Sequence, residues 1–455
     1  MNLKCIKNSF FKKLLENNMN SESIKQRYNL LLEDVIETLA DDIDSTRDLL
    51  FRKSGIENLV ENFVDIQNFA SGIVLSFGTG KFSKVIEYGN SREYIYKNGD
   101  FVNDIFPISK GSIFDLASVS KVFTCYTIMK LYEEGIIDID IPISEYDKRF
   151  VNVQDYSLRN FLTFQKNFST HKLITDAKTI EEAELILFNI QANELTLRPY
   201  SDMGSIIAKY IVENTLNKNF FDIVYEKIIV PCGLNETFIS NSNISKDLFV
   251  SNNFERKILF NKCSVDCQTK LGVVHDSKAK LLGNFGKTFS GHAGLFSTAL
   301  DMAKFSQQIL NQKIISKSMI YEIVKNYVGF KDENENYSQF LGMLCHTKHP
   351  IELNSEVYDL LSNHAVAQGG YTGTYLTYDI DNDIYLFLGA NRCHNRITTI
   401  SQEISSENIK EANDWKIKYT NTHKYAWQRD ELIHKALDLS IQYKFLEYII
   451  QNCEL

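Results

Sequence analysis

Apolar residues recur at helical spacing near both ends of the chain. Near the start, Ser23 and Gln26 have the spacing of a capping box, and an apolar stripe follows them (Ile24, Tyr28, Leu31, Val35 and Leu39). This pattern predicts an amphipathic helix from residue 23 to about residue 40. A similar stripe predicts a final helix, which we expect to cover the core (Leu432, Ala436, Leu439, Tyr443 and Leu446).

Short runs rich in β-branched and aromatic residues begin at Gly72. The runs GIVLSF, SKVIEYG and EYIY, with turn signals at residues 78–80 and 98–99, predict an antiparallel meander. Late in the chain, TYLTYD and IYLFLG flank residues 381–383 and predict a hairpin. From residue 118 to about residue 300 the pattern is mostly helical.

Strands at both ends and helices between them combine most simply in one sheet. We therefore expect an α+β fold, in which an antiparallel β-sheet flanked by helices is built from both chain ends and carries an inserted, mostly helical subdomain. The crevice where the layers meet is the expected ligand site. The expected organisation is an N-terminal helical extension (1–56), a main domain (57–405), and a polar linker with a C-terminal helix that packs on the sheet (406–455).

The composition is that of a folded, weakly acidic protein. The chain has 455 residues, is 44% hydrophobic and carries a net charge of −9, which argues against nucleic acid as a partner. No apolar run is long enough for a membrane span, and the N-terminal segment lacks the apolar region of a secretory signal, so we expect a cytoplasmic protein. A homodimer is plausible if either terminal helix exposes an apolar stripe.

The cysteines suggest no zinc motif. Eight of them are scattered along the chain (Cys5, Cys125, Cys232, Cys263, Cys267, Cys345, Cys393 and Cys453). There is no CxxC pair, and no Cys/His spacing is typical of a zinc site. We expect free thiols in a reducing compartment.

The first candidate for chemistry is the SxxK pair Ser118 and Lys121, where an apolar, strand-like approach gives way to a long helix. Side chains at i and i+3 lie on one helical face, so the lysine can reach the hydroxyl as its base. A lysine serves as a base only when neutral, and we expect burial and the positive helix end to lower its pKa. The alternative is that Ser118 caps the helix while Lys121 extends to solvent.

The second candidate is the YxD triplet of Tyr200 and Asp202, which precedes another helical run. A tyrosine at a loop tip can relay a proton between the hydroxyl, the lysine and a leaving group. The alternative is that Ser201 or Asp202 caps the helix and Tyr200 covers it.

The third candidate is the glycine-rich segment from Gln368 through Gly370 and Tyr371 to Thr374, which runs into the late hairpin. A glycine-rich edge strand lets the backbone approach a ligand, and one of its N–H groups can join that of Ser118 in an oxyanion hole. The alternative is a β-bulge or a turn.

The order of these three segments resembles that of the serine β-lactamase and penicillin-binding-protein superfamily. Within this superfamily, it resembles most the branch of class C β-lactamases, DD-peptidases, esterases and D-amino-acid-specific amidases. The resemblance covers roughly residues 57–400. It rests on FDLASVSKVFT, LYEEGIIDIDIPISEY, RPYSDMGSIIAKYI, VVHDSKAKLLGNFGKTFSGHAGLFSTALDMAKF and GGYTGTYLTYDIDNDIYLFLGANR.

This resemblance implies a β-lactamase/transpeptidase-like fold and acyl transfer through an acyl-enzyme, without metal or cofactor. Ser118 would be the nucleophile, and Lys121 and Tyr200 would share the acid and base work. The N–H groups of Ser118 and Tyr371 would form the oxyanion hole. The substrate would be a small ester, amide or peptide-like molecule.

Two departures from the family pattern bear on the substrate. Asp202 stands where Asn is common, and its charge can pair with Lys121 or attract a substrate amine. Gln368, Gly369 and Gly370 stand where Lys-Thr-Gly or His-Thr-Gly is usual. Because the cationic or proton-bearing group is missing, we expect inefficient β-lactam hydrolysis and a preference for esters over amides.

Two other functions compete with this prediction. One is a catalytically weak homologue that serves as a binding or regulatory module, which the loss of the basic third-triplet residue favours. The other is a penicillin-binding or β-lactamase-type enzyme.

Overall fold

The computed structural model describes residues 22–98, 100–240, 244–259, 262–267, 269–351, 355–400 and 422–453. Gly99 of the predicted second turn, residues 1–21 of the predicted extension and most of the predicted polar linker lie outside these ranges. Among the described helices, none has the length and apolar character needed to cross a membrane.

The main sheet joins the two ends of the chain, as predicted. Its seven strands lie in the order β10-β11-β12-β13-β1-β2-β3, and neighbouring strands are antiparallel. They are β1 (Gly72–Thr79), β2 (Ser83–Lys97), β3 (Asp100–Pro107), β10 (His346–Thr347), β11 (Ala365–Gly369), β12 (Tyr375–Asp379) and β13 (Ile384–Ala390). The predicted meander corresponds to β1–β3 and the predicted hairpin to β12–β13. The two parts join where β1 pairs with β13, with Leu75 opposite Leu388.

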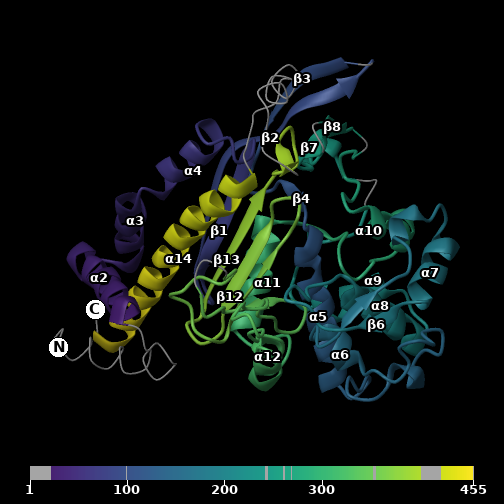
Figure 1. Ribbon diagram of the computed structural model, residues 1–455. Coiled ribbons are helices and arrows are strands. Elements are labelled where there is room, and N and C mark those ends of the chain that lie inside the picture. The colour runs from purple at the N-terminus through teal and green to yellow at the C-terminus, as the bar shows by residue number, and fades with distance from the viewer. Residues whose placement is uncertain are drawn as a thin grey trace.

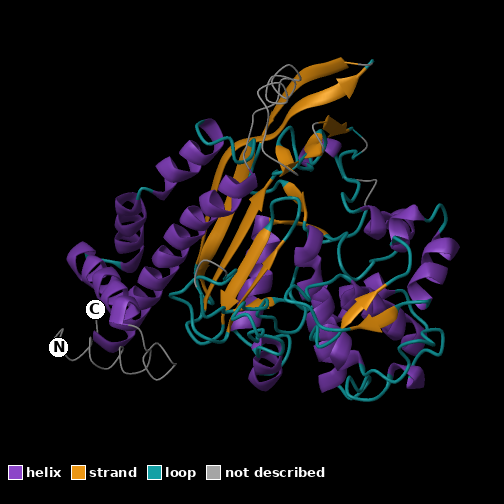
Figure 2. Ribbon diagram, in the orientation of Figure 1, coloured by secondary structure: helices purple, strands orange, loops and turns teal. Residues whose placement is uncertain are grey.

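Helices cover both faces of this sheet (Figures 1 and 2). Along β1, Ile73 and Leu75 face a core shared with α14 (Thr422–Cys453), whereas Val74 faces a core shared with α5 (Ser120–Glu133) and α11 (Ala299–Leu310). This alternation is the period of two that a strand buried on both faces requires. Helix α14 therefore covers one face of the sheet.

The inserted region is helical with short strand pairs, and in Figure 1 most of it lies beside the sheet as a separate lobe. Its helices include α6 (Leu158–Leu162), α7 (Ile180–Phe188), α8 (Met203–Leu216), α9 (Phe220–Val224), α10 (Ser277–Leu282) and α12 (Lys317–Val324). The strand pairs are β4 (Ile113–Asp115) with β9 (Phe296–Thr298), β5 (Asn167–Ser169) with β6 (Gln191–Asn193), and β7 (Glu255–Leu259) with β8 (Lys262–Asp266), to which β14 (Ile397–Ile400) adds in parallel.

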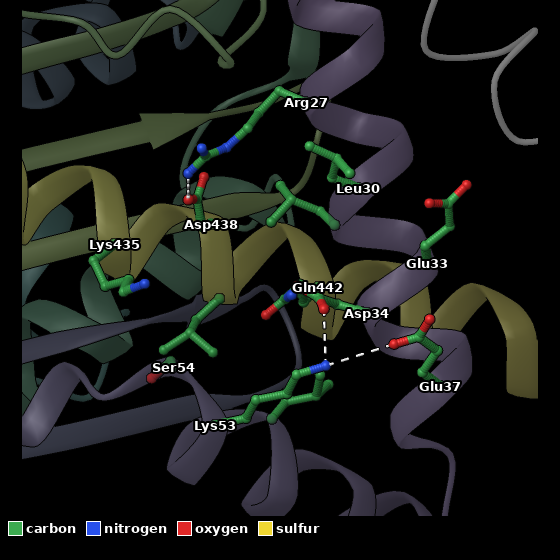
Figure 3. Close-up of a pocket in the computed structure, with 13 residues that line it drawn as sticks. Arg27, Leu30, Glu33, Asp34, Glu37, Lys53, Ser54, Lys435, Asp438 and Gln442 are labelled. Atoms are coloured by element: carbon green, nitrogen blue, oxygen red, sulfur yellow. Dashed lines mark hydrogen bonds and ion pairs between the residues drawn. The ribbon is translucent and has the colours of Figure 1, made fainter.

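The N-terminal helices α2 (Glu22–Thr38), α3 (Ile43–Ser54) and α4 (Ile56–Asp65) pack with α14. A cavity of about 440 Å³ between α2, α3 and α14 is lined by paired charges (Figure 3). There, Lys53 Nζ lies 2.8 Å from Asp34 Oδ1, and Arg27 binds Asp438. The buried apolar faces of α2 and α14 meet within one chain, so they give no argument for a dimer.

One half-buried histidine of this layer should make stability depend on pH. His434 on α14 stacks on Tyr358 with ring centroids 4.0 Å apart, and burial, helped by Arg27, lowers its pKa from 6.5 to about 4. The unfolded chain binds a proton there first, so stability should fall as the pH drops from about 6.5 to 4. At about 1.4 kcal/mol per pKa unit, the full shift corresponds to a contribution of about 3.5 kcal/mol. Urea denaturation at several pH values should show a flatter profile for His434→Gln; an unchanged profile would contradict the assignment.

Candidate active site

Ser118 lies in a tight turn between a strand and a helix. The 3-10 turn Ala117–Val119 follows β4 and leads into α5, and Ala117 adopts a left-handed backbone (φ 45°). The Asp115 carboxylate supports this turn by accepting the Ala117 N–H at 2.9 Å. Ser118 is partly exposed while the residues on either side of it are buried. Its side chain does not cap α5, so the turn presents the hydroxyl to the site.

Lys121 reaches Ser118 as the spacing predicts. Its Nζ donates to Ser118 Oγ at 2.7 Å and lies 2.7 Å from Asp202 Oδ1, and its side chain is fully buried. Burial alone would lower the pKa of Lys121, but Asp202 and Tyr200 outweigh burial and raise it above its ordinary value. The expectation of a lowered lysine pKa is therefore wrong for the site without substrate, because the carboxylate holds the proton on the amine.

Tyr200 lies beside this lysine, and its ring packs against two other aromatic rings. The Lys121 Nζ is 5.1 Å from the centroid of its ring, which stacks on Phe164 and His346 at centroid distances of 5.5 and 5.1 Å. The Gln368 Nε2 donates to its hydroxyl at 2.8 Å. The tyrosine hydroxyl thus has an amide donor where the resemblance implies a cationic group.

Asp202 pairs with two lysines and does not cap α8 through its side chain. Its Oδ1 binds Lys121, and its Oδ2 binds Lys278 of α10. Burial would raise the pKa of Asp202, but Lys121, His292 and Lys278 hold it well below its usual range. Ser201 takes the capping role instead, since its Oγ accepts the Met203 N–H at 3.2 Å. The sequence analysis did not identify Lys278, since no spacing relates it to Asp202.

The glycine-rich segment packs directly on the Ser118 turn. Thr372 Oγ1 donates to the Asp115 carbonyl and Thr374 Oγ1 to the Leu116 carbonyl, both at 2.8 Å. A Cβ added at Gly370 would lie 2.7 Å from that Leu116 oxygen, so the close approach requires glycine. The segment begins on β11, which is one strand inside the sheet edge formed by β10, and not on the edge strand as expected.

Tyr371 is the exposed residue of this turn, with 43% of its surface accessible. Its hydroxyl donates to Glu255 Oε1 at 2.5 Å, and its carbonyl accepts from Arg392 Nη1 at 2.9 Å. The structure thus brings the predicted site residues together, through contacts with one another or with the Ser118 turn. Tyr371 has no such side-chain contact, but its neighbours Gly370 and Thr372 pack on that turn.

Two curated relatives share part of the sequence. A protein of Escherichia coli K12 whose name assigns it provisionally to the D-alanyl-D-alanine carboxypeptidases is 24% identical over 315 residues, which are 63% of this chain and 70% of that protein. The N-acetylmuramyl-L-alanine amidase of Bacillus subtilis is 26% identical over 286 residues, which are 56% of this chain and 62% of that protein.

The fold is similar to that of solved enzymes, and a family model matches most of the chain. A β-lactamase/D-alanine carboxypeptidase of Pseudomonas syringae gives a TM-score of 0.58 at 13% identity, covering 85% of this chain and 98% of that one. The D-amino acid amidase of Ochrobactrum anthropi gives a TM-score of 0.55 at 16% identity, and it also covers 85% of this chain and 98% of that one. The family model described as Beta-lactamase matches residues 93–398. The chain therefore belongs to the β-lactamase family of serine hydrolases.

Proposed function

We propose that this protein is a serine hydrolase that cleaves a small ester or amide through an acyl-enzyme on Ser118. The observation that carries the proposal is the 2.7 Å contact between Lys121 Nζ and Ser118 Oγ, where the 3-10 turn leads into α5. An alcohol becomes a good nucleophile only when a base takes its proton, and this contact is within the reach that such a transfer needs.

In this proposal the Ser118 proton passes to the pair formed by Lys121 and Tyr200 as the oxygen attacks the substrate carbonyl. Lys121 carries a proton in the resting site, so the pair accepts another only when Tyr200 is a phenolate or Lys121 has passed its proton on. The amide N–H from Gln368 stabilises negative charge on the Tyr200 oxygen. The pair then returns the proton to the leaving group, and water hydrolyses the acyl-enzyme.

The remaining predicted residues would bind the substrate. The N–H groups of Ser118 and Tyr371 would hold the developing oxyanion, and Gly370 and Gln368 would line the acyl side. Asp202 would set the charge of the site together with Lys278, whose side chain is partly exposed. Lys278 offers a positive charge that Gln368 lacks, so it is our candidate partner for a substrate carboxylate.

Substrate class is tested with a panel of p-nitrophenyl esters and amino-acid anilides. We expect faster turnover of the esters, because Gln368 gives less help to an amine leaving group than a lysine or histidine would. The names of the relatives, a carboxypeptidase and two amidases, favour amides instead. Turnover of anilides alone would reverse the ester preference while leaving the serine mechanism intact.

Tyr200→Phe tests the proton relay. The change removes the hydroxyl but keeps the ring between Phe164 and His346, so we expect an intact fold and a kcat lowered about 100-fold to 10,000-fold. Steady-state kinetics with the best ester measure this, with Tyr156→Phe as the control. A change confined to KM would contradict a role in proton transfer.

The competing proposal is a catalytically weak binding module, favoured by the resting ion pair of Lys121 with Asp202 and by Gln368. It predicts a folded protein that turns over no member of the panel and forms no adduct with an activated phosphonate. Penicillin tried in parallel tests the β-lactam alternative through a lasting adduct.

A further inference from the structure

Three side chains that are distant in sequence converge behind Tyr371. Glu255 begins β7, His275 precedes α10, and Cys393 follows β13, yet a carboxylate oxygen, an imidazole nitrogen and the thiol sulfur all lie within 4.8 Å of one another. Glu255 is 1% exposed and Cys393 is fully buried. The proposed acyl transfer uses none of these three groups.

Glu255 and His275 lie at ion-pair distance without a well-formed hydrogen bond between them. Glu255 Oε2 and His275 Nε2 are 3.1 Å apart, but within the described part of the chain neither atom has a hydrogen-bond partner. Two ligands of one tetrahedral zinc ion, each about 2.1 Å from it, are separated by roughly 3.4 Å. The two atoms are therefore spaced as ligands of a shared cation.

The other carboxylate oxygen fixes the orientation of Glu255. Its Oε1 accepts from Tyr371 at 2.5 Å and from Thr398, which leaves Oε2 directed at His275. Hydrogen bonds of this kind orient metal-ligating carboxylates. Lys257 Nζ lies 3.5 Å from Oε2, and its side chain is 37% exposed, so it has room to withdraw when a cation enters.

We propose that Glu255, His275 and Cys393 form a binding site for a divalent transition-metal ion of the zinc class. Mixed oxygen, nitrogen and sulfur donors suit zinc, and three protein ligands leave a fourth position for water or for the Tyr371 phenol. On binding, the Cys393 thiol releases its proton to solvent and the thiolate bonds to the metal. In the described part of the chain, a second cluster of this kind (Asp202, Asp276 and His292) differs because Lys121 and Lys278 already pair with the Asp202 carboxylate.

The proposed metal site contacts both turns that would supply the oxyanion hole, the turn of Ser118 and the turn of Tyr371. His275 stacks on the Tyr371 ring at 5.6 Å, and Cys393 Sγ donates to the Tyr371 carbonyl at 3.6 Å. On the other side, the backbone N–H of His275 donates to Asp115 Oδ2 at 2.6 Å, and Asp115 supports the turn of Ser118. A bound ion would fix the two turns relative to each other. This effect on acylation rests on the proposed function, whereas metal binding does not.

Cobalt provides an optical test of the site. We expect full-length protein, stripped with a chelator and titrated with Co²⁺, to bind one equivalent and develop a near-ultraviolet thiolate-to-cobalt absorption that Zn²⁺ abolishes. Cys393→Ser should lose this absorption, while Cys345→Ser, a change at another buried thiol, should keep it. Glu255→Gln preserves the side-chain shape and should weaken binding at least about tenfold.

The opposing results are equally defined. The site would be overturned if the protein bound less than about a tenth of an equivalent of Co²⁺, which is the background level. It would also be overturned if the absorption were unchanged in both Cys393→Ser and Glu255→Gln. Where Cys393→Ser fails to fold, the Glu255→Gln titration decides. The rate of fluorophosphonate labelling at Ser118 should rise when Zn²⁺ is added. An unchanged rate with metal bound would overturn the link to the oxyanion hole, and absence of all labelling would instead overturn the proposed hydrolase.

Discussion

Ser118→Ala should abolish turnover, with kcat lowered by at least about 10,000-fold, the scale seen when a catalytic serine is removed. The reason is that the acylated oxygen is lost, while the Lys121 and Asp202 pair that shapes the site stays in place. Since Ser118 is partly exposed and accepts one hydrogen bond from Lys121, the change should leave the urea midpoint nearly unaltered. Steady-state kinetics and denaturation curves measure both.

Ser277→Ala is the matched control for this change. Ser277 begins a second SxxK sequence with Lys280, but it is exposed at the start of α10. We expect normal turnover from it. Normal turnover by folded Ser118→Ala would refute the nucleophile assignment.

Lys121→Met should lower kcat about 100-fold to 10,000-fold, because it removes the group that contacts the attacking oxygen and shares a proton with Tyr200. Methionine keeps much of the buried volume, and Asp202 retains Lys278, so the remaining carboxylate still has a cationic partner. We therefore expect a folded variant with strongly reduced activity. The measurement is kcat and kcat/KM on the best ester, alongside Lys280→Met as control.

Lys121→Arg separates proton transfer from charge. A guanidinium pairs with Asp202 but cannot give up its proton in a protein, so the proposed relay predicts inactivity. Substantial activity in the arginine variant would show that positive charge alone suffices and would contradict a role for Lys121 as a base.

The main sheet and its covering helix could be predicted because their residues repeat a strong local pattern. The runs that became β1, β12 and β13 are long, β-rich and bounded by turn residues, and the stripe of α14 has a clear helical period. The pairs β4–β9 and β5–β6 have three-residue strands, which are too short for a period to be visible. Tertiary packing, not local propensity, decides such strands.

The contact between Ser118 and Lys121 could be predicted for the same reason. Ser118 and Lys121 are close in sequence, and their spacing fixes their meeting on one turn. The direction of the shift in the Lys121 pKa could not be inferred, because it depends on Asp202, which lies just before α8. Lys278 carried no signal either, since it shares no motif with the carboxylate it binds.

The candidate metal ligands illustrate the limit of spacing rules. Zinc motifs are recognised when ligands stand a few residues apart, whereas Glu255, His275 and Cys393 come from three segments that only the fold unites. The separation of His275 from Cys393 along the chain hides any such pattern, so only the folded structure brings these groups together.

Intact-mass spectrometry after treatment with a fluorophosphonate tests the central claim most directly. We predict a single adduct on the wild-type protein, mapped to the peptide that carries Ser118, and no adduct on Ser118→Ala under the same conditions. A folded wild-type protein that takes no adduct, or one that is labelled equally with and without Ser118, would contradict the account.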